Sequence, residues 1–163
     1  MDIIVMSRTE AKRETFKPCA PSTAIISITD MDKERNLFQH PDWLKYTFRF
    51  QFDDVDIGQK GCITQTQANK IAEAVEMVKD KVERIIVHCE AGISRSSGVA
   101  AAIMKYLTGD DMEIFGNGRY TPNMTCYRMV LNALNEPFDE DEVQDKKNYN
   151  ISLWKKLFDE GYI

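Results

Sequence analysis

A cysteine and an arginine separated by five residues stand in the stretch IIVHCEAGISRSSG, at positions 85–98. Cys89 follows a run of apolar residues, and Arg95 precedes a stretch rich in serine and alanine. Gly92, between them, allows the backbone to turn tightly. A thiol, a guanidinium and a tight loop in this order indicate a site that binds an anion.

The physical chemistry of such a loop favours phosphate as the anion. Backbone N–H groups that turn inward between a strand and a helix form an anion-binding concavity, and a helix beginning near Ser96 adds its unpaired N–H groups and the positive end of its dipole. The Arg95 guanidinium can bind two phosphate oxygens at once. In this positive potential we expect the pKa of Cys89 to fall below the usual value of about 8.5, giving a thiolate nucleophile.

Attack on a phosphate ester also needs an acid that protonates the leaving oxygen. Three aspartates, Asp53, Asp54 and Asp56, lie 33 to 36 residues before Cys89. Neighbouring carboxylates raise one another's pKa, which suits an acid that must be protonated near neutral pH. Each of the three is therefore a candidate general acid.

The patterns around these residues predict an α/β domain with a central, mainly parallel sheet flanked by helices. Apolar or alternating runs predict strands at 2–6, 23–29, 45–52 and 84–88, the third with Tyr46, Phe48, Phe50 and Phe52 on its buried face. Helical spacing predicts helices at 64–83, 96–107 and 122–134, and a last one through Ile151, Trp154, Leu157 and Phe158. Ligands gather beyond the carboxyl ends of parallel strands, so the aspartates and Cys89 should face one crevice.

Local signals refine these helices. Ser7 and Glu10 fit a capping box that opens a short helix, and Thr121 with Pro122 fits the cap and first position of the 122–134 helix. We expect residues 136–145, which contain six carboxylates, to form a solvated loop, and Trp154 to lie in the core.

Composition limits the function classes. The chain of 163 residues has a formal charge of −5, which argues against a nucleic-acid surface, and no apolar run reaches the length of a membrane span. No signal peptide is evident, and the four cysteines are far apart in the sequence, so no disulfide framework is expected. We expect a single domain over residues 1–163, cytoplasmic and monomeric.

The string His88-Cys89, five residues, then Arg95-Ser96 resembles the signature of the cysteine-dependent protein tyrosine phosphatase superfamily, and HCEAGISRS is similar to its dual-specificity branch. The resemblance implies a protein tyrosine phosphatase-like fold and a phosphocysteine intermediate on Cys89. Ser96 would assist breakdown of that intermediate, and His88 would support the loop. Phosphate, or a sulfate ion, would be bound by Arg95 and the backbone of the loop residues Glu90, Ala91, Gly92, Ile93 and Ser94.

The same resemblance bears on the acid and on the substrate. The FDD string is similar to the acid loop of small phosphatases of this superfamily, where the second aspartate is the acid, so we expect Asp54, with Asp56 and then Asp53 as alternatives. Pro122-Asn123 resembles a packing element of dual-specificity phosphatases. The substrate implied is a phosphorylated protein, at tyrosine and also at serine or threonine, or another phosphomonoester such as a phosphoinositide or RNA 5′-phosphate. No metal ion or cofactor is implied.

Two other functions fit a thiolate in an anion loop. One is a phospho-binding pseudophosphatase, and the other is a rhodanese-like or arsenate-reductase-like enzyme. We expect Cys19, Cys62 and Cys126 to be buried structural thiols, with redox protection of Cys89 as the alternative for Cys62 and Cys126. His40 is the other histidine of the chain, and His88 next to Cys89 fits no usual metal-ligand spacing.

Overall fold

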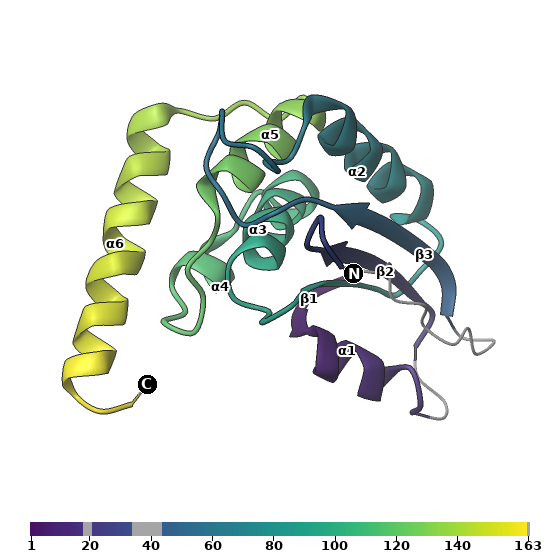
Figure 1. Ribbon diagram of the computed structural model, residues 1–163, viewed down its shortest axis with the longest axis horizontal. Helices are drawn as coiled ribbons and strands as arrows, with labels where there is room; N and C mark the ends of the chain where they lie inside the picture. The colour runs from purple at the N-terminus through teal and green to yellow at the C-terminus, as the bar shows by residue number, and fades with distance from the viewer. Residues whose placement is uncertain (18–20, 34–43, 163) are drawn as a thin grey trace.

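A computed structural model describes residues 1–17, 21–33 and 44–162, so Cys19 and His40 lie outside the described residues (Figure 1). The strands are β1 (Asp2–Ser7), β2 (Thr23–Thr29), β3 (Leu44–Gln51) and β4 (Arg84–Cys89). The helices are α1 (Arg8–Glu14), α2 (Gln65–Val78), α3 (Arg95–Thr108), α4 (Met112–Phe115), α5 (Met124–Ala133) and α6 (Glu140–Asp159).

The four described strands form one parallel sheet in the order β1-β4-β2-β3, as the sequence predicts. The inner strands β2 and β4 are buried along their whole length, which explains their continuous apolar runs. Cys89, the last residue of β4, is in register with Ser7 at the end of β1. The thiol therefore lies at the carboxyl edge of the sheet, on an inner strand.

Helices cover both faces of the sheet. In Figure 1, α1 lies below the sheet, and α2, α3 and α5 lie above it. The α1 face has a small core, in which Ala11 packs with Ile25, Leu44 and Ile86, whereas the opposite face has the main core. The layered α/β architecture thus places α3, the helix that follows Cys89 and begins at Arg95, in the main core against β1 and β4.

Most of the predicted strands and helices are confirmed, but the predicted N-cap residue of α5 is wrong. The predicted cap was Thr121 with Pro122 as first helical residue, whereas the helix begins at Met124 and is capped by Asn123. The Asn123 side chain accepts a hydrogen bond from the Cys126 N–H at 2.9 Å, so it satisfies one of the N–H groups that a helix start leaves unpaired. The helix predicted at 64–83 also ends earlier, at Val78.

The predicted solvated loop at residues 136–145 is wrong as well, because most of it belongs to α6. Asp139 caps the helix by accepting hydrogen bonds from the N–H groups of Asp141 and Glu142. Carboxylates in a first turn interact favourably with the positive end of the helix dipole. The acidic run is therefore a helix start.

Trp154 is not a core residue, contrary to expectation. Its exposed fraction is 39 %, and its ring stacks on that of Phe158 at 5.3 Å between centroids. The helix α6 lies at the edge of the molecule, away from the sheet (Figure 1), so only part of its apolar stripe meets a partner. None of the described helices is long and apolar enough to cross a membrane.

A buried charged network fastens α6 to the rest of the fold. Lys146 forms an ion pair at 2.8 Å with Asp111, which is 1 % exposed and also accepts a hydrogen bond from the Tyr127 hydroxyl. Asn150, also buried, donates to the Phe115 carbonyl at 3.0 Å. The position of α6 therefore depends on polar contacts with the α4 region and α5.

We expect Lys146→Ala to lower the free energy of unfolding by about 3 kcal/mol, because it leaves the buried Asp111 carboxylate without its cation. Urea unfolding followed by circular dichroism measures the change. Lys147→Ala is the matched control: Lys147 is exposed, and its removal should change stability by at most about 0.5 kcal/mol. Equal losses in both variants would show that the buried pair does not fasten α6.

Candidate active site

The loop between β4 and α3 is seated on the end of β1. Gly92 has φ 73°, and a Cβ atom there would lie 2.4 Å from the Ser7 nitrogen and 2.5 Å from the Met6 carbonyl carbon. Arg8 fixes the other side of the loop: its N–H donates to the Glu90 carbonyl at 3.1 Å, and its guanidinium pairs with the Glu90 carboxylate at 2.6 Å. Only glycine fits this combination of backbone conformation and contact.

Hydrogen-bond donors converge on the Cys89 sulfur. The Gly92 N–H donates to Sγ at 3.3 Å, and the Ser96 hydroxyl oxygen lies 3.1 Å from Sγ. Burial of the thiol opposes its ionisation. Hydrogen bonds from the Ser96 hydroxyl and from the N–H groups of Ser96, Gly92 and Ile93 outweigh this opposition, so the pKa of Cys89 lies below its ordinary value.

The other described cysteines have the opposite environment. Burial and the nearby Asp54 carboxylate raise the pKa of Cys126, which is 1 % exposed. Cys62 is half-buried, so the expectation of a fully buried thiol is wrong for this residue, and the burial it has raises its pKa, against a backbone hydrogen bond from Gly58. Among the three cysteines that the structure describes, all of them free thiols, Cys89 alone is shifted toward the thiolate.

His88 is a buried support beneath the loop. Its side chain is fully buried, and Nδ1 lies 3.2 Å from the Cys89 carbonyl oxygen. Burial is the main cause that lowers the pKa of His88 to about 4, and the positive charges of Arg8 and Lys12 lower it further. The imidazole is therefore neutral near pH 7, and its partner is the backbone rather than the sulfur.

Two contacts fix the Arg95 side chain, which is 5 % exposed. Its Nη1 donates to the Phe52 carbonyl at 2.8 Å and forms an ion pair with Asp30 at 2.6 Å. Nε is buried and makes no hydrogen bond with the described residues. A phosphate oxygen would satisfy this donor, because buried N–H groups are normally paired.

Sequence reasoning did not identify Asp30 as part of the site. The available signal was its place directly after β2, which neighbours β4 in the parallel sheet. Carboxyl ends of neighbouring parallel strands meet at one edge, so Asp30 could have been expected near Arg95.

The three candidate acids occupy different environments. Asp54 is exposed, and its Oδ1 accepts hydrogen bonds from the Ser94 hydroxyl and the Asn123 side-chain amide, both at 2.8 Å. Asp53 instead accepts from the Met31 N–H at 2.9 Å. Of the three, Asp54 is the carboxylate whose hydrogen bonds reach the 89–95 loop, and Asn123 joins it to α5.

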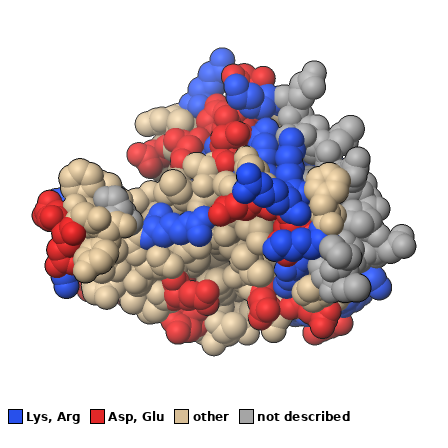
Figure 2. All heavy atoms as spheres, turned by 90° about the horizontal axis from the view of Figure 1, so that it is seen from below, with Lys and Arg blue, Asp and Glu red and all other residues tan. Residues whose placement is uncertain are grey.

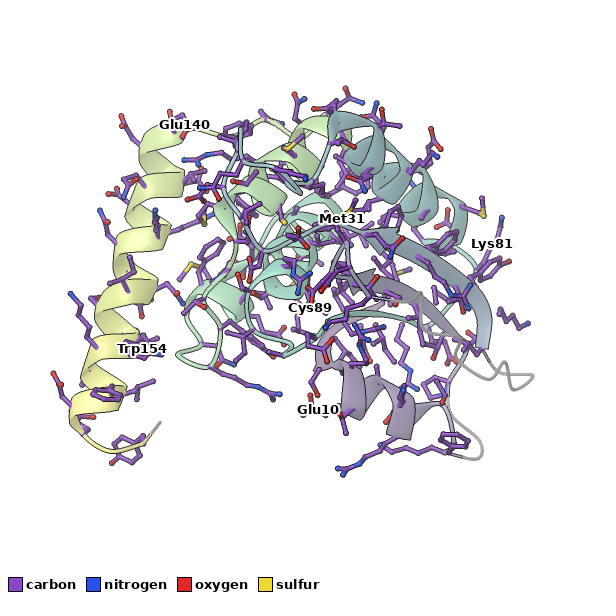
Figure 3. All side chains as sticks on the ribbon, viewed as in Figure 1. Glu10, Met31, Lys81, Cys89, Glu140 and Trp154 are labelled. Atoms are coloured by element: carbon purple, nitrogen blue, oxygen red, sulfur yellow. The ribbon has the colours of Figure 1, made fainter. Side chains whose placement is uncertain are left out.

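A cavity of about 410 Å³ lies beside Asp54 and the loop. Its lining combines residues of the acid segment (residues 53–59, which contain the three candidate acids) with Ser94, the start of α5 and one residue of α6. The lining residues are Asp54, Val55, Asp56, Gln59, Ser94, Pro122, Asn123, Met124 and Lys147. Near the middle of Figure 3, Cys89 and Met31 are labelled where the loops after the strands gather. The described residues contain no group of three or more histidine, cysteine or carboxylate side chains placed to hold a metal ion.

Two solved structures are similar to this chain in fold. A crystal structure of PTPMT1 in complex with PI(5)P has a TM-score of 0.53 and 12 % sequence identity, covering 89 % of this chain and 94 % of PTPMT1. A crystal structure of a Tk-PTP mutant has a TM-score of 0.44 and 14 % identity, covering 96 % of this chain and 91 % of Tk-PTP. No family model and no curated protein sequence matches the chain.

The chain therefore has the α/β fold of the cysteine-based, protein tyrosine phosphatase-like enzymes, as the resemblance of its HCx5RS string implied. The likeness to PTPMT1 extends over most of both chains. At 12 % identity it establishes the fold and leaves the reaction to the site itself.

We expect Gly92→Ala to cost about 3 kcal/mol of stability, because the strain of a positive φ adds to a steric cost of about 1–3 kcal/mol against the end of β1. Gly109→Ala is the matched control. Gly109 has φ 78° but nothing lies within 4 Å of its Cβ position, so only the strain of about 1 kcal/mol applies. Thermal and urea unfolding compare them, and equal losses would contradict the packing of the loop on β1.

We expect Ser96→Ala to raise the pKa of the Cys89 thiol, because it removes the hydroxyl that hydrogen-bonds the sulfur. The pH dependence of iodoacetamide alkylation, with the labelled residue identified by mass spectrometry, measures the shift. The wild-type midpoint should lie below the free-cysteine value of about 8.5. Ser97→Ala is the control, since the Ser97 hydroxyl donates to the Ile93 and Ser94 carbonyls instead. A larger shift in Ser97→Ala would refute the assignment.

Proposed function

We propose that this protein is a cysteine-dependent phosphatase that hydrolyses phosphomonoesters through a phosphocysteine intermediate. The observation that carries the proposal is the convergence on one loop of a thiol with lowered pKa and a buried arginine whose Nε has no hydrogen-bond partner among the described residues. A nucleophile and an anion-binding group are thus supplied together, next to a carboxylic acid candidate.

In the first step, the Cys89 thiolate attacks phosphorus, the S–P bond forms and the P–O bond to the leaving group breaks. Arg95 and the N–H groups of residues 90–95 bind the phosphate oxygens and stabilise the charge of the transition state. Asp54 donates a proton to the leaving oxygen. Its Oδ1 accepts hydrogen bonds from Ser94 and Asn123, so the proton is carried on the other oxygen.

In the second step, Asp54 takes a proton from water as the water oxygen attacks phosphorus. The O–P bond forms, the S–P bond breaks, and inorganic phosphate leaves. The Ser96 hydroxyl, 3.1 Å from Sγ, donates a hydrogen bond to the departing thiolate. His88 holds the loop from below in its neutral form. No metal ion or cofactor takes part in this reaction.

The proposed substrates are phosphorylated proteins, at tyrosine and also at serine or threonine. Exposed apolar side chains in the segments next to Asp30, Asp56 and Ser94 support an aromatic leaving group: Met31, Ile57 and Ile93 are 56 %, 74 % and 39 % exposed. The PTPMT1 structure contains PI(5)P, which makes a phosphoinositide the alternative substrate. We also propose that residues 1–163 form one domain, monomeric and cytoplasmic, since a reducing compartment suits the free thiols of Cys62, Cys89 and Cys126.

Activity assays separate this proposal from its rivals. We expect Cys89→Ser to abolish hydrolysis of p-nitrophenyl phosphate and phosphotyrosine. Asp54→Asn should lower the rate on phosphotyrosine by about 10²- to 10⁴-fold and the rate on p-nitrophenyl phosphate by much less, because nitrophenolate leaves without protonation. Asp56→Asn is the control and should change both rates little.

Three results would overturn the assignment. Hydrolysis that survives Cys89→Ser would exclude the thiolate mechanism. Phosphopeptide binding without hydrolysis by the wild type would indicate a pseudophosphatase. Thiosulfate or arsenate turnover in place of ester hydrolysis would indicate the rhodanese-like or arsenate-reductase-like alternative.

A further inference from the structure

We propose that the cavity between the acid segment and α6 selects the substrate, and that Lys147 binds an acidic side chain close to the phosphotyrosine of a protein substrate. The inference rests on the proposed phosphatase function and adds to it a preferred substrate class and the residue that sets the preference. Lys147 is separated from the catalytic loop by 52 positions in the sequence (147 minus 95), yet it lines a cavity together with Ser94 and Asp54.

The position of this cavity relative to the reaction determines what binds there. Asp54 protonates the oxygen that leaves with the alcohol, so the rest of the substrate extends past Asp54. The cavity of about 410 Å³ begins at that residue and reaches Lys147. Its contents are therefore the leaving group and its neighbouring residues, and not the phosphate that Arg95 binds.

The structure places the backbone of Lys147 on α6 and leaves its charge without an ion pair among the described residues. Lys146 is tied to the buried Asp111, and Val143 and Asn150 on the same helix are 2 % and 3 % exposed. Lys147 itself is exposed, and no ion pair joins it to a carboxylate among the described residues. An ammonium held at the mouth of a substrate cavity without a partner provides a place for one carboxylate of a ligand.

The surrounding charges favour a peptide over a phosphoinositide in an anionic membrane. Glu90 lies in the 89–95 loop, and two arginines are already paired with carboxylates, Arg8 with Glu90 at 2.6 Å and Arg119 with Glu10 at 3.1 Å. Figure 2 shows the α1 face, where basic side chains lie among acidic ones rather than in one continuous patch. Binding several phosphates on an anionic surface requires a cluster of unpaired basic side chains. Binding one carboxylate of a peptide requires a single basic side chain.

Asp56, in the acid segment, adds a charge opposite to that of Lys147 and so narrows which peptide position can carry the preferred carboxylate. Asp56 lines the same cavity as Lys147, without an ion pair between them. A basic side chain of a substrate would be attracted by Asp56 and repelled by Lys147. An acidic side chain would be attracted by Lys147 and repelled by Asp56. The proposal therefore requires that the preferred carboxylate occupy a single peptide position, the one that meets the α6 side of the cavity.

The test uses phosphotyrosine peptides that carry one glutamate, scanned over the three positions on each side, with matched glutamine peptides. Binding is measured by calorimetry on the Cys89→Ser protein and turnover as kcat/KM on the active protein. We expect about a fivefold preference for glutamate at one position, the size of an exposed ion pair. Lys147→Gln should remove the preference, and Lys147→Glu should reverse it toward a lysine peptide.

Lys155→Glu is the matched control, since Lys155 lies two turns further along α6 and does not line the cavity; it should keep the wild-type preference. Each turnover value is divided by the same variant's value for p-nitrophenyl phosphate. Hydrolysis with no glutamate preference, a preference that survives Lys147→Glu, or faster turnover of a soluble phosphatidylinositol 5-phosphate than of every peptide would overturn the inference. Selective binding without any turnover would instead refute the phosphatase proposal alone.

Discussion

The contact between the 89–95 loop and the end of β1 is the constraint on which the site depends. Gly92 lies against the backbone of Met6 and Ser7, so the loop must turn where it does. That turn directs the N–H groups of Gly92, Ile93 and Ser96 to the Cys89 sulfur. Neutral donors of this kind stabilise a thiolate in a buried place without a second charge, and the nearby Arg95 guanidinium pairs with Asp30 instead.

Ser94 connects the anion-binding part of the site with the acid. Its carbonyl accepts hydrogen bonds from the N–H groups of Gly98 and Asn123, and its hydroxyl donates to Asp54. Asn123 in turn caps α5 and donates to the same carboxylate. Gly98 permits this arrangement, since a Cβ atom there would lie 2.4 Å from the Asn123 carbonyl oxygen. Three separate segments are thereby brought to one carboxylate.

The sequence predicted the residues with strong local signals, and missed those defined by contacts between distant segments. Cys89, Arg95 and the parallel sheet follow from a short motif and from strand periodicity, which are local properties. Asp30 beside Arg95, Asn123 as helix cap and the exposure of Trp154 depend on strand order and on where α6 lies. An apolar stripe shows that a face can be buried, but only the packing of the whole fold decides how much of it is.

Because α6 lies at the edge of the molecule, the residues proposed to select the substrate are separate from those proposed to carry out the reaction. The helix supplies none of the groups assigned to the two chemical steps, yet one of its residues, Lys147, lines the cavity beside them. Its attachment relies on a few residues, Lys146 and Asn150 among them. Substitutions of the exposed side chains of α6 can therefore change the lining of the cavity while Asp54 and the residues of the 89–95 loop stay the same. Under the proposed function, α6 is the part of the fold in which substrate preference and the chemical steps are encoded by separate residues.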